Sequence, residues 1–209
     1  MIHMNRQVLG LVAGLCFVSY VEAQEQSSVV RIEEDWELVV NYSDPSENLP
    51  SVQTTILPGG RDTTTRLELL LNHATHPNFS PGGYQLRVVA GEKNVGYKRA
   101  HKGRRLVEGE VIRWTQVVQK SDDGIYFGIL NGQSETWGRF GGATSFIFLP
   151  NKVAGFEGLD AYRADLSQEL LKQAEAKKPA ATIRLLKVRV SRDGQEQPET
   201  RLISMPNKR

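Results

Sequence analysis

Residues 110–142, EVIRWTQVVQKSDDGIYFGILNGQSETWGRFGG, decide the fold class, because two turn signals divide them into three runs of strand-forming residues. Asn131-Gly132 is the strongest short-range hairpin signal, since a type I′ turn needs a positive φ at both central residues. Asp123-Gly124 provides the second turn signal. The stretch therefore predicts a three-stranded antiparallel meander at the centre of an all-β domain.

The Asn-Gly signal also predicts a register for the meander. A two-residue loop places Leu130 opposite Gln133 and Tyr126 opposite Trp137. The second of these is an aromatic cross-strand pair, which contributes up to about 1 kcal/mol relative to two alanines. We therefore expect the rings of Tyr126 and Trp137 to be in contact.

Further strands are predicted on both sides of the meander from the spacing of apolar residues. In residues 29–40, the apolar side chains of Ile32, Trp36 and Leu38 alternate with acidic ones, and Glu34 is the exception on the inner side. The other predicted strands are residues 51–58, 66–72, 84–90, 146–149, 182–190 and 199–205, the last of them as an edge strand.

One helix is predicted near the C-terminal third. Asp165 is its N-cap, Leu166, Leu170 and Ala174 lie on one face, and Pro179 ends it. Many short strands with frequent turn signals, together with this helix, predict an all-β fold, a two-sheet antiparallel sandwich. The apolar runs YFGIL and FIFL predict strands that are covered on both faces. An eight-stranded barrel is the main alternative.

The first 23 residues have the pattern of a secretory signal peptide. Arg6 gives a positively charged start, residues 8–20 an apolar core, and Ala23 the small residue of a cleavage site. The apolar run is shorter than the about 20 residues that span a bilayer, and no other run is long enough. We therefore expect a secreted or periplasmic protein with no transmembrane segment, a disordered mature N-terminus at residues 24–28 and a single domain at residues 29–209.

The cysteine content and the net charge exclude some functions. The chain has 209 residues, a formal net charge of +2 and one cysteine, Cys16, which lies inside the predicted signal. The mature chain would then have no disulfide, no thiolate metal site and no cysteine nucleophile. Export without disulfides favours a bacterial envelope or extracellular setting. The net charge implies no particular partner, so the distribution of charge is more informative.

The meander resembles the core of laminin-G-like and concanavalin A-like sandwiches. In those domains a strand with a tryptophan leads through an Asp/Asn-Gly turn to an apolar strand that ends in another Asp/Asn-Gly. Here these elements are Trp114, Asp123-Gly124 and Asn131-Gly132. The resemblance implies a jelly-roll sandwich and, by analogy, a carbohydrate-related role. The whole chain is also similar to secreted bacterial proteins, a likeness that implies no function.

An acidic strand is the first candidate site. Alternation places Glu33, Asp35 and Glu37 on one face, with roughly 7 Å between neighbours. This arrangement is similar to the E-x-D-x-E strand of laminarinase-type glucanases, which implies Glu33 as nucleophile, Glu37 as acid/base and Asp35 as modulator. Glu34 departs from that pattern, since the family has an aliphatic residue there. The alternatives are a solvated acidic face on an edge strand and a cation site.

A basic run is the second candidate site. Seven cationic or titratable residues fall within residues 93–105, in a chain whose charge is otherwise balanced. In an exported protein, an acidic or sulfated polysaccharide or another anionic surface fits such a run better than nucleic acid. The alternative is a solvated hairpin or loop. The predicted ligand-binding residues are Tyr84, Tyr97, Lys98, Arg99, His101, Lys102, Arg104 and Arg105.

Other residues carry weaker signals. His73 and His76 have a spacing that suits zinc, but polar loop histidines are the alternative, and no metal site is predicted. The glycine-rich residues 138–142 are interpreted as a bend or bulge beneath Trp137. Three tryptophans are expected in the core, namely Trp36, Trp114 and Trp137. Four loop aromatics are expected to stack on a sugar ring, namely Tyr42, Phe79, Tyr84 and Tyr97.

These patterns favour an exported, non-catalytic binding module for a polysaccharide or another anionic extracellular surface, without a cofactor. One alternative is a glycoside hydrolase built on Glu33, Asp35 and Glu37. A second alternative is a structural envelope or matrix protein. The ligand, the oligomeric state and the strand order stay open from the sequence.

Overall fold

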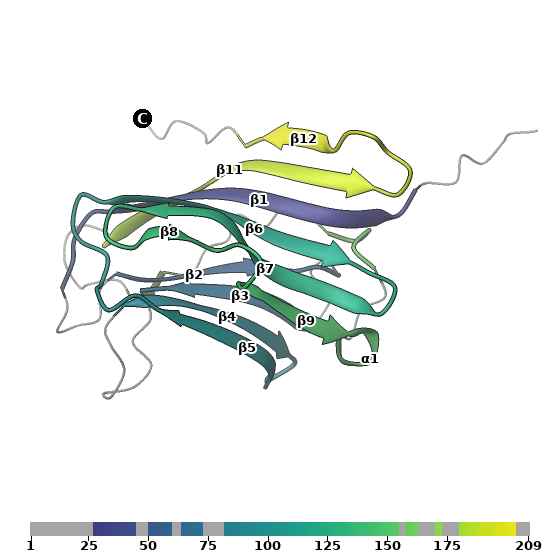
Figure 1. The fold of residues 1–209 in the computed structure, drawn as a ribbon, viewed down its shortest axis with the longest axis horizontal. Coiled ribbons are helices and arrows are strands. Elements are labelled where there is room, and N and C mark those ends of the chain that lie inside the picture. Colours follow the sequence, from purple (N-terminus) through teal and green to yellow (C-terminus); the bar gives the residue numbers. More distant parts are fainter. Residues whose placement is uncertain are drawn as a thin grey trace, which may run out of the picture.

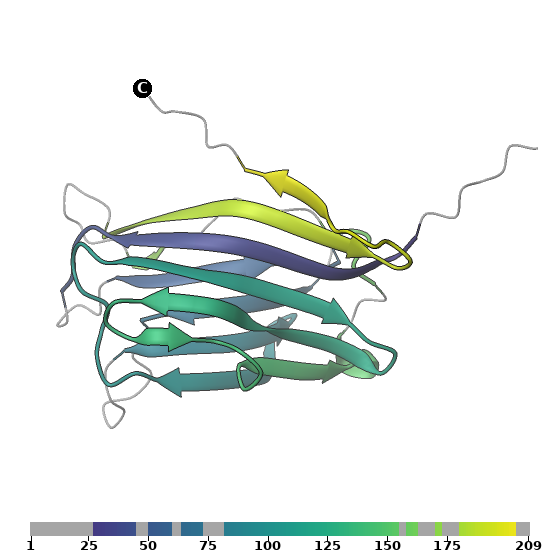
Figure 2. The same cartoon turned by 45° about the horizontal axis from the view of Figure 1, so that its top comes forward.

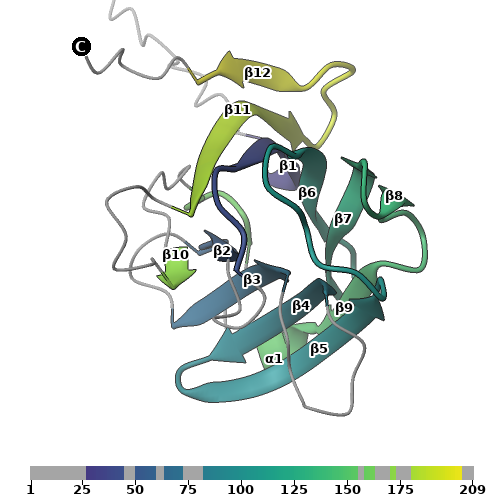
Figure 3. The same cartoon turned by 90° about the vertical axis from the view of Figure 1, so that its left-hand side faces the viewer.

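The computed structural model describes residues 27–44, 50–59, 64–72, 82–154, 158–162, 170–172 and 180–203. In these ranges the chain forms two antiparallel sheets that pack against each other (Figure 1), which confirms the all-β, two-sheet sandwich. The end-on view separates the two layers clearly (Figure 3). No helix in the described ranges is long and apolar enough to cross a membrane.

The larger sheet has the strand order β12-β11-β1-β6-β7-β8, and the smaller sheet has the order β10-β2-β3-β4-β5. The strand β9 pairs with the first half of β7, and β8 pairs with its second half. The larger sheet consists of β1 (Val29–Val40), β6 (Val111–Lys120), β7 (Gly124–Ser134), β8 (Gly138–Phe140), β9 (Phe146–Pro150), β11 (Ala181–Arg192) and β12 (Glu199–Leu202). The smaller sheet consists of β2 (Ser51–Ile56), β3 (Thr65–Leu71), β4 (Gly83–Ala90), β5 (Lys93–His101) and β10 (Leu170–Lys172), and one short helix, α1 (Asn151–Ala154), follows β9.

The core lies between the sheets and follows the predicted alternation of β1. Ile32, Trp36 and Leu38 are buried, while the alternate side chains Glu33, Asp35 and Glu37 are only partly buried. Trp36 stacks on Trp114 of β6, with ring centroids 6.3 Å apart. Trp137 is buried as well, so the prediction of three core tryptophans is confirmed. The apolar faces of the two sheets therefore cover each other, as burial of apolar area requires.

Glu34 is a charged residue at an inward position of β1, where the pattern otherwise has apolar residues, and it is buried in the core. Its carboxylate accepts hydrogen bonds from Trp36 Nε1 at 3.0 Å and from the Tyr162 hydroxyl at 2.7 Å. Burial, and then the neighbouring charge of Glu34, raise the pKa of Tyr162, so that its hydroxyl stays protonated and continues to donate. Since a buried carboxylate is costly without such partners, the hydrogen bonds from Tyr162 and Trp36 stabilise the Glu34 carboxylate in the core.

The turn predicted between β6 and β7 is confirmed. The amide of Ser121 donates to the Gly124 carbonyl at 2.8 Å, and the Gly124 amide donates back to the Ser121 carbonyl at 3.4 Å. Asp122 and Asp123 therefore form a two-residue hairpin loop, and β6 and β7 pair antiparallel beyond it.

The turn predicted at Asn131-Gly132 is wrong. Both residues lie inside β7, and the chain reverses only at residues 135–137. Asn131 has a positive φ of 55°, but it serves a β-bulge in which two residues of β7 lie opposite Trp114 of β6. The left-handed conformation that Asn tolerates suits a bulge as well as a turn. The pairing with neighbouring strands therefore continues past the Asn-Gly pair.

The predicted register fails with that turn. Leu130 does not lie opposite Gln133, and Tyr126 does not lie opposite Trp137. Tyr126 lies opposite Phe148 of β9 instead, with ring centroids 4.9 Å apart. These two rings are partly exposed, so the prediction that YFGIL and FIFL are covered on both faces is also wrong.

The remaining strand predictions agree with the fold apart from small shifts at the strand ends. They correspond to β2, β3, β4, β9, β11 and β12, and β12 lies at the edge of its sheet. The predicted helix is wrong at residues 170–172, which form β10 and pair with β2. The rest of that predicted helix lies outside the described residues, as do the predicted signal peptide and residues 24–26.

Glycines in β7 provide space for phenylalanine rings of the neighbouring strands. A Cβ at Gly128 would lie 2.5 Å from the ring of Phe146, and a Cβ at Gly132 would lie 2.5 Å from the ring of Phe140. An aromatic ring over a strand glycine covers backbone that has no side chain of its own. Close packing of β8 and β9 against β7 therefore depends on these glycines.

Replacing Gly128 by alanine is expected to destabilise the fold by about 1–3 kcal/mol, as overpacked cores do. The new methyl group would meet the Phe146 ring and the Ser145 carbonyl, both at 2.5 Å. Urea unfolding followed by tryptophan fluorescence measures the change. Gly158→Ala is the control, since its Cβ would meet only the flexible side chain of Asp160, at 3.4 Å. Equal stability of the two variants would contradict this packing.

Candidate functional site

The acidic strand β1 lies in the interior of the larger sheet, where it pairs with β6 on one side and β11 on the other. The alternative that placed it on an edge is therefore wrong. Glu33, Asp35 and Glu37 share the outer face of the sheet, as the alternation predicts.

Neighbouring side chains bind the first two of these carboxylates. Arg189 of β11 donates from Nε to Glu33 Oε2 at 2.6 Å, and from Nη1 and Nη2 to the two oxygens of Asp35 at 2.5 and 2.8 Å. Arg31 contacts Glu33 at 2.7 Å, and the Thr115 hydroxyl donates to Asp35 at 2.8 Å. A single guanidinium thus bridges two carboxylates, a strong charge-assisted arrangement.

The pKa values follow from these bonds. Burial alone would raise the pKa of Glu33, but the hydrogen bonds from Arg189 and Arg31 outweigh it and hold that pKa below its usual value. The hydrogen bond to Asp35, and then the one to Glu33, raise the pKa of Arg189 despite its burial. Glu33 and Arg189 are therefore both charged at neutral pH.

Glu37 is bound from both sides of β1. Arg113 of β6 donates to its Oε2 from Nε and Nη2, at 3.0 and 2.7 Å, and Arg184 of β11 lies 3.7 Å from Oε1. The guanidinium groups therefore take up the carboxylate oxygens that an acid/base residue would direct at the glycosidic oxygen or at the attacking water. We call the seven residues of this face the ionic strip, namely Arg31, Glu33, Asp35, Glu37, Arg113, Arg184 and Arg189.

Replacing Arg189 by glutamine is expected to raise the pKa of Glu33, because burial then acts with only Arg31 opposing it. Carbon-detected NMR titration of the Glu33 carboxyl measures this shift. Wild-type Glu33 contributes stability above its unfolded-state pKa, and loses it as the pH falls through the lower folded-state pKa, so the variant should lose stability at neutral pH. An unchanged Glu33 titration would contradict the ionic strip, and Arg201→Gln on β12 is the control.

The basic run forms β5, the edge strand of the smaller sheet, and the loop after it. It pairs with β4 through a turn at residues 91–92, so the predicted hairpin alternative describes the local structure. Tyr97 and Arg99 share one face of β5, with the guanidinium carbon 5.1 Å from the ring centroid. His101 lies on that same face by alternation and is exposed.

Lys98 and Lys102 lie on the other face of the run and reach the larger sheet. Lys98 Nζ is 3.5 Å from the Phe146 carbonyl of β9, and Lys102 Nζ is 3.5 Å from the Arg139 carbonyl of β8. We call this line, where β5 faces β8 and β9, the seam. No carboxylate of the described residues lies within 4.0 Å of the charged nitrogens of Lys98, Lys102 or Arg139.

The last two residues of the basic run follow β5 in the chain. The Arg104 carbonyl accepts a hydrogen bond from Trp137 Nε1 at 2.8 Å, which ties this loop to the turn between β7 and β8. Arg105 is partly buried, and burial lowers the pKa of its guanidinium. Its Nη1 has no hydrogen-bond partner among the described residues.

Of the aromatic residues predicted to stack on a sugar ring, the structure shows two exposed and one buried. Tyr84 lies in β4 rather than a loop and is buried against Phe140, with its hydroxyl bonded to Ser145 Oγ at 2.7 Å, so its role as an exposed ligand-binding residue is wrong. Tyr97 and Tyr42 are exposed, as predicted for stacking residues. Phe79 and the predicted loop histidines His73 and His76 lie outside the described residues.

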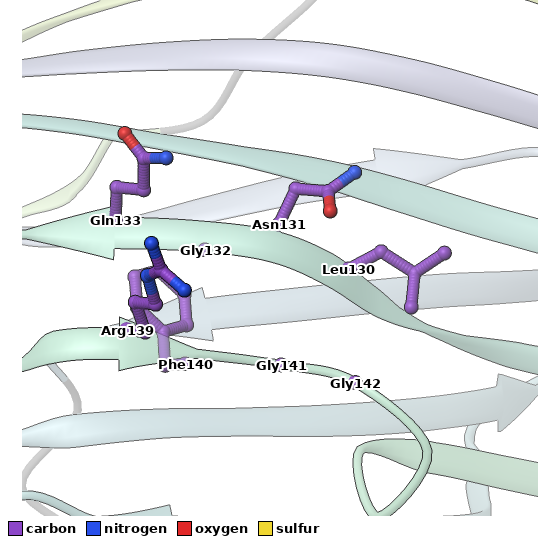
Figure 4. Close-up of a pocket in the computed structure, with 8 residues that line it drawn as sticks. All are labelled: Leu130, Asn131, Gly132, Gln133, Arg139, Phe140, Gly141 and Gly142. Atoms are coloured by element: carbon purple, nitrogen blue, oxygen red, sulfur yellow. The ribbon is translucent and has the colours of Figure 1, made fainter.

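An open pocket of about 470 Å³ lies on the larger sheet where β7 meets β8 and the segment after it (Figure 4). The Asn131 bulge creates it, because the bulge turns Gly132 toward the core and leaves the side chains of Asn131 and Gln133 exposed. Gln133 lies opposite Arg139 in the β7–β8 pair. The lining residues are Leu130, Asn131, Gly132, Gln133, Arg139, Phe140, Gly141 and Gly142.

The pocket contacts both predicted sites at its borders. Asn131 Nδ2 lies 3.5 Å from Thr115 Oγ1, and Thr115 in turn donates to Asp35 of the ionic strip. On the opposite side, Lys102 of the basic run lies against the Arg139 backbone. Sequence reasoning missed the pocket because it assigned Asn131-Gly132 to a turn. The second glycine-rich stretch at residues 138–142 was the signal that could have indicated it.

Glu110 holds the β7–β8 turn beside this pocket. Its Oε1 accepts from the Ser134 hydroxyl and from the Thr136 amide at 2.9 Å, and its Oε2 accepts from the Thr136 hydroxyl at 2.7 Å and the Val107 amide at 3.2 Å. Burial alone would raise the pKa of Glu110, but these bonds, that of Ser134 first, hold it below its usual value. The buried carboxylate thus orients the turn that leads into β8, where Arg139 lies.

Glu110→Gln is expected to lower the free energy of unfolding at neutral pH by about 1–3 kcal/mol, because an amide nitrogen cannot accept these bonds. The wild-type contribution is present above the unfolded-state pKa of Glu110 and is lost as the pH falls through its lower folded-state pKa. The difference between the proteins should therefore shrink below about pH 4 in urea unfolding. A difference that is constant with pH would contradict this role, and Glu108→Gln in the same loop is the control.

Within the described ranges, no three His, Cys, Asp or Glu side chains gather closely enough to hold a metal ion. No protein-family model, curated protein or solved structure matches the chain.

Proposed function

We propose that this protein is a non-catalytic binding module for an acidic polysaccharide, and that one sugar unit occupies the pocket between β7 and β8. The observation that carries the proposal is the pocket of about 470 Å³, which two exposed amide side chains and Arg139 line. Beside it lies the seam, whose lysines form no ion pair with a carboxylate of the described residues. Its volume lies in the range of small-ligand pockets.

The lining groups match the chemistry of an acidic sugar. Asn131 and Gln133 each offer a carboxamide that both donates and accepts hydrogen bonds, as ring hydroxyls require. The Arg139 guanidinium can bind a carboxylate or sulfate through two parallel bonds. Leu130 and the glycines Gly141 and Gly142 present a small apolar surface on which the C–H groups of a sugar ring can lie.

The seam supplies the counter-charge beyond the pocket. Lys98 lies in β5 and Lys102 directly follows it, and four residues of extended chain correspond to roughly 13 Å. Since neither forms an ion pair with a described carboxylate, each is available to a polyanion. The sequence expectation of export, which places the protein where such polymers occur, supports the same proposal.

The ionic strip favours binding over hydrolysis. Arg189 and Arg31 bind Glu33, and Arg113 and Arg184 bind Glu37, so the pair proposed as nucleophile and acid/base is already engaged. A retaining glycosidase needs both carboxyl groups directed at the sugar. The ionic strip is better explained as cross-strand pairing that stabilises the sheet.

Arg139→Gln is expected to weaken binding of polygalacturonate about tenfold or more, because it removes a charge-assisted contact. Isothermal titration at low and high salt measures the effect, with dextran as the neutral polymer, and wild-type affinity for polygalacturonate should fall as salt rises. Gln133→Ala should weaken binding with less effect on the salt dependence. Arg201→Gln on the distant strand β12 is the matched control.

Binding that is unchanged in Arg139→Gln, or weakened equally in Arg201→Gln, would contradict the pocket. Release of reducing sugar by the wild type that disappears in Glu33→Gln would support the hydrolase instead.

A further inference from the structure

Aromatic side chains form a second exposed feature on the outer face of the larger sheet. Tyr126 of β7 and Phe148 of β9 are 39% and 43% exposed, and their ring centroids lie 4.9 Å apart. Large exposed aromatic pairs are uncommon on a surface without a partner, since each ring leaves a large apolar area in water.

Glycines keep this aromatic pair close to the sheet. A Cβ at Gly124 would lie 2.8 Å from the Phe148 ring, and one at Gly128 would lie 2.5 Å from the Phe146 ring. Both phenylalanine rings therefore lie over the backbone of β7. The result is a low apolar strip made of Phe148, Tyr126 and Phe146, which we call the aromatic strip.

The aromatic strip leads to the pocket. Tyr126 and Leu130 point to the same face of β7, because they are separated by an even number of residues and both precede the bulge. Four residues correspond to roughly 13 Å along a strand. The ring of Phe146 covers Gly128 between them. Figure 2 shows β9 beside the first half of β7 and β8 beside its second half, so that strip and pocket follow one another along a single strand.

The seam cations run parallel to this line. Lys98 contacts the backbone of Phe146, which belongs to the aromatic strip, and Lys102 contacts the backbone of Arg139, which lines the pocket. One ammonium group therefore lies beside the middle of the line, at Phe146, and the other lies beside the pocket. A linear polyanion along β7 would pass a cation at Phe146 and another beside the pocket, which is the charge complementarity that an acidic polymer requires.

We propose that Tyr126 and Phe148 form a second carbohydrate subsite, and that an acidic polysaccharide lies as an extended chain from the pocket along β7 to this platform. The inference rests on the proposed function of the pocket. It adds that the protein recognises several consecutive units of the chain, with the apolar face of one sugar ring packed on the Tyr126–Phe148 pair.

The experiment compares a digalacturonate with a longer oligogalacturonate by isothermal titration. Wild-type protein should bind the longer oligomer more tightly. Tyr126→Ala and Phe148→Ala should each weaken the longer oligomer about tenfold and leave the digalacturonate unchanged, since only the longer chain reaches the platform. Tyr126→Trp should retain the wild-type affinity, because it keeps an aromatic face.

Tyr42→Ala is the matched control, because Tyr42 is also 39% exposed but lies away from β7. Phe148→Leu keeps apolar volume without an aromatic face, and it replaces Phe148→Ala if the alanine variant does not fold. Equal affinity of the Tyr126→Ala variant and the wild type for the longer oligomer would overturn the second subsite. If Arg139→Gln still weakened binding in that case, the proposed function of the pocket would stand; if the wild type bound neither oligomer, both proposals would fall.

Discussion

The pairing of β6 with β7 through the Asn131 bulge is the constraint on which the rest of the structure depends. β7 pairs with β6 on one side and with both β8 and β9 on the other, so the register of β7 decides where each of these strands lies. The bulge adds one residue opposite Trp114, which changes the faces that the following residues meet. The Phe140 ring then packs over Gly132 on the core side, and Gln133 is exposed beside Arg139. Without the extra residue the pocket would have no amide side chains.

Charge is arranged differently over the ionic strip of the larger sheet and at the seam between the two sheets. On β1 each of the carboxylates Glu33, Asp35 and Glu37 has at least one arginine partner, so these carboxylates are neutralised from within the sheet. At the seam the ammonium groups of Lys98 and Lys102 contact backbone carbonyls, and no carboxylate of the described residues lies within 4.0 Å of them. Cations without a carboxylate partner among the described residues attract an anion more strongly than cations that are already paired. The separation of these two regions underlies our choice of a binding function over a hydrolytic one.

The sequence predicts the fold class well because local signals and tertiary structure agree in most strands. The period-2 pattern of β1 identifies its buried face, and Asp122-Asp123-Gly124 identifies the first hairpin. The Asn-Gly signal failed because a positive φ is compatible with a bulge, and only the partner strands β8 and β6 decide between the two. The predicted helix is wrong at Leu170–Lys172, because pairing with β2 overrides a weak helical periodicity there.

The candidate site was predicted less completely than the fold. The basic run was identified from composition, but only the structure separates Lys98 and Lys102, which reach the seam, from Arg99 on the other face. Tyr84 was misplaced because an aromatic residue next to a glycine-rich loop has the same local sequence whether it points outward or into the core. The pocket combines residues from β7 and β8 with those that follow, and the false turn at Asn131 concealed that combination.

Two-dimensional amide NMR of the labelled protein, titrated with an oligogalacturonate, tests the central claim most directly. The account predicts saturable shifts at residues 130–133 and 139–142 around the pocket, with no comparable change at Tyr97 on the far face of β5. Shifts confined to β1, or spread evenly over every exposed lysine and arginine, would contradict it.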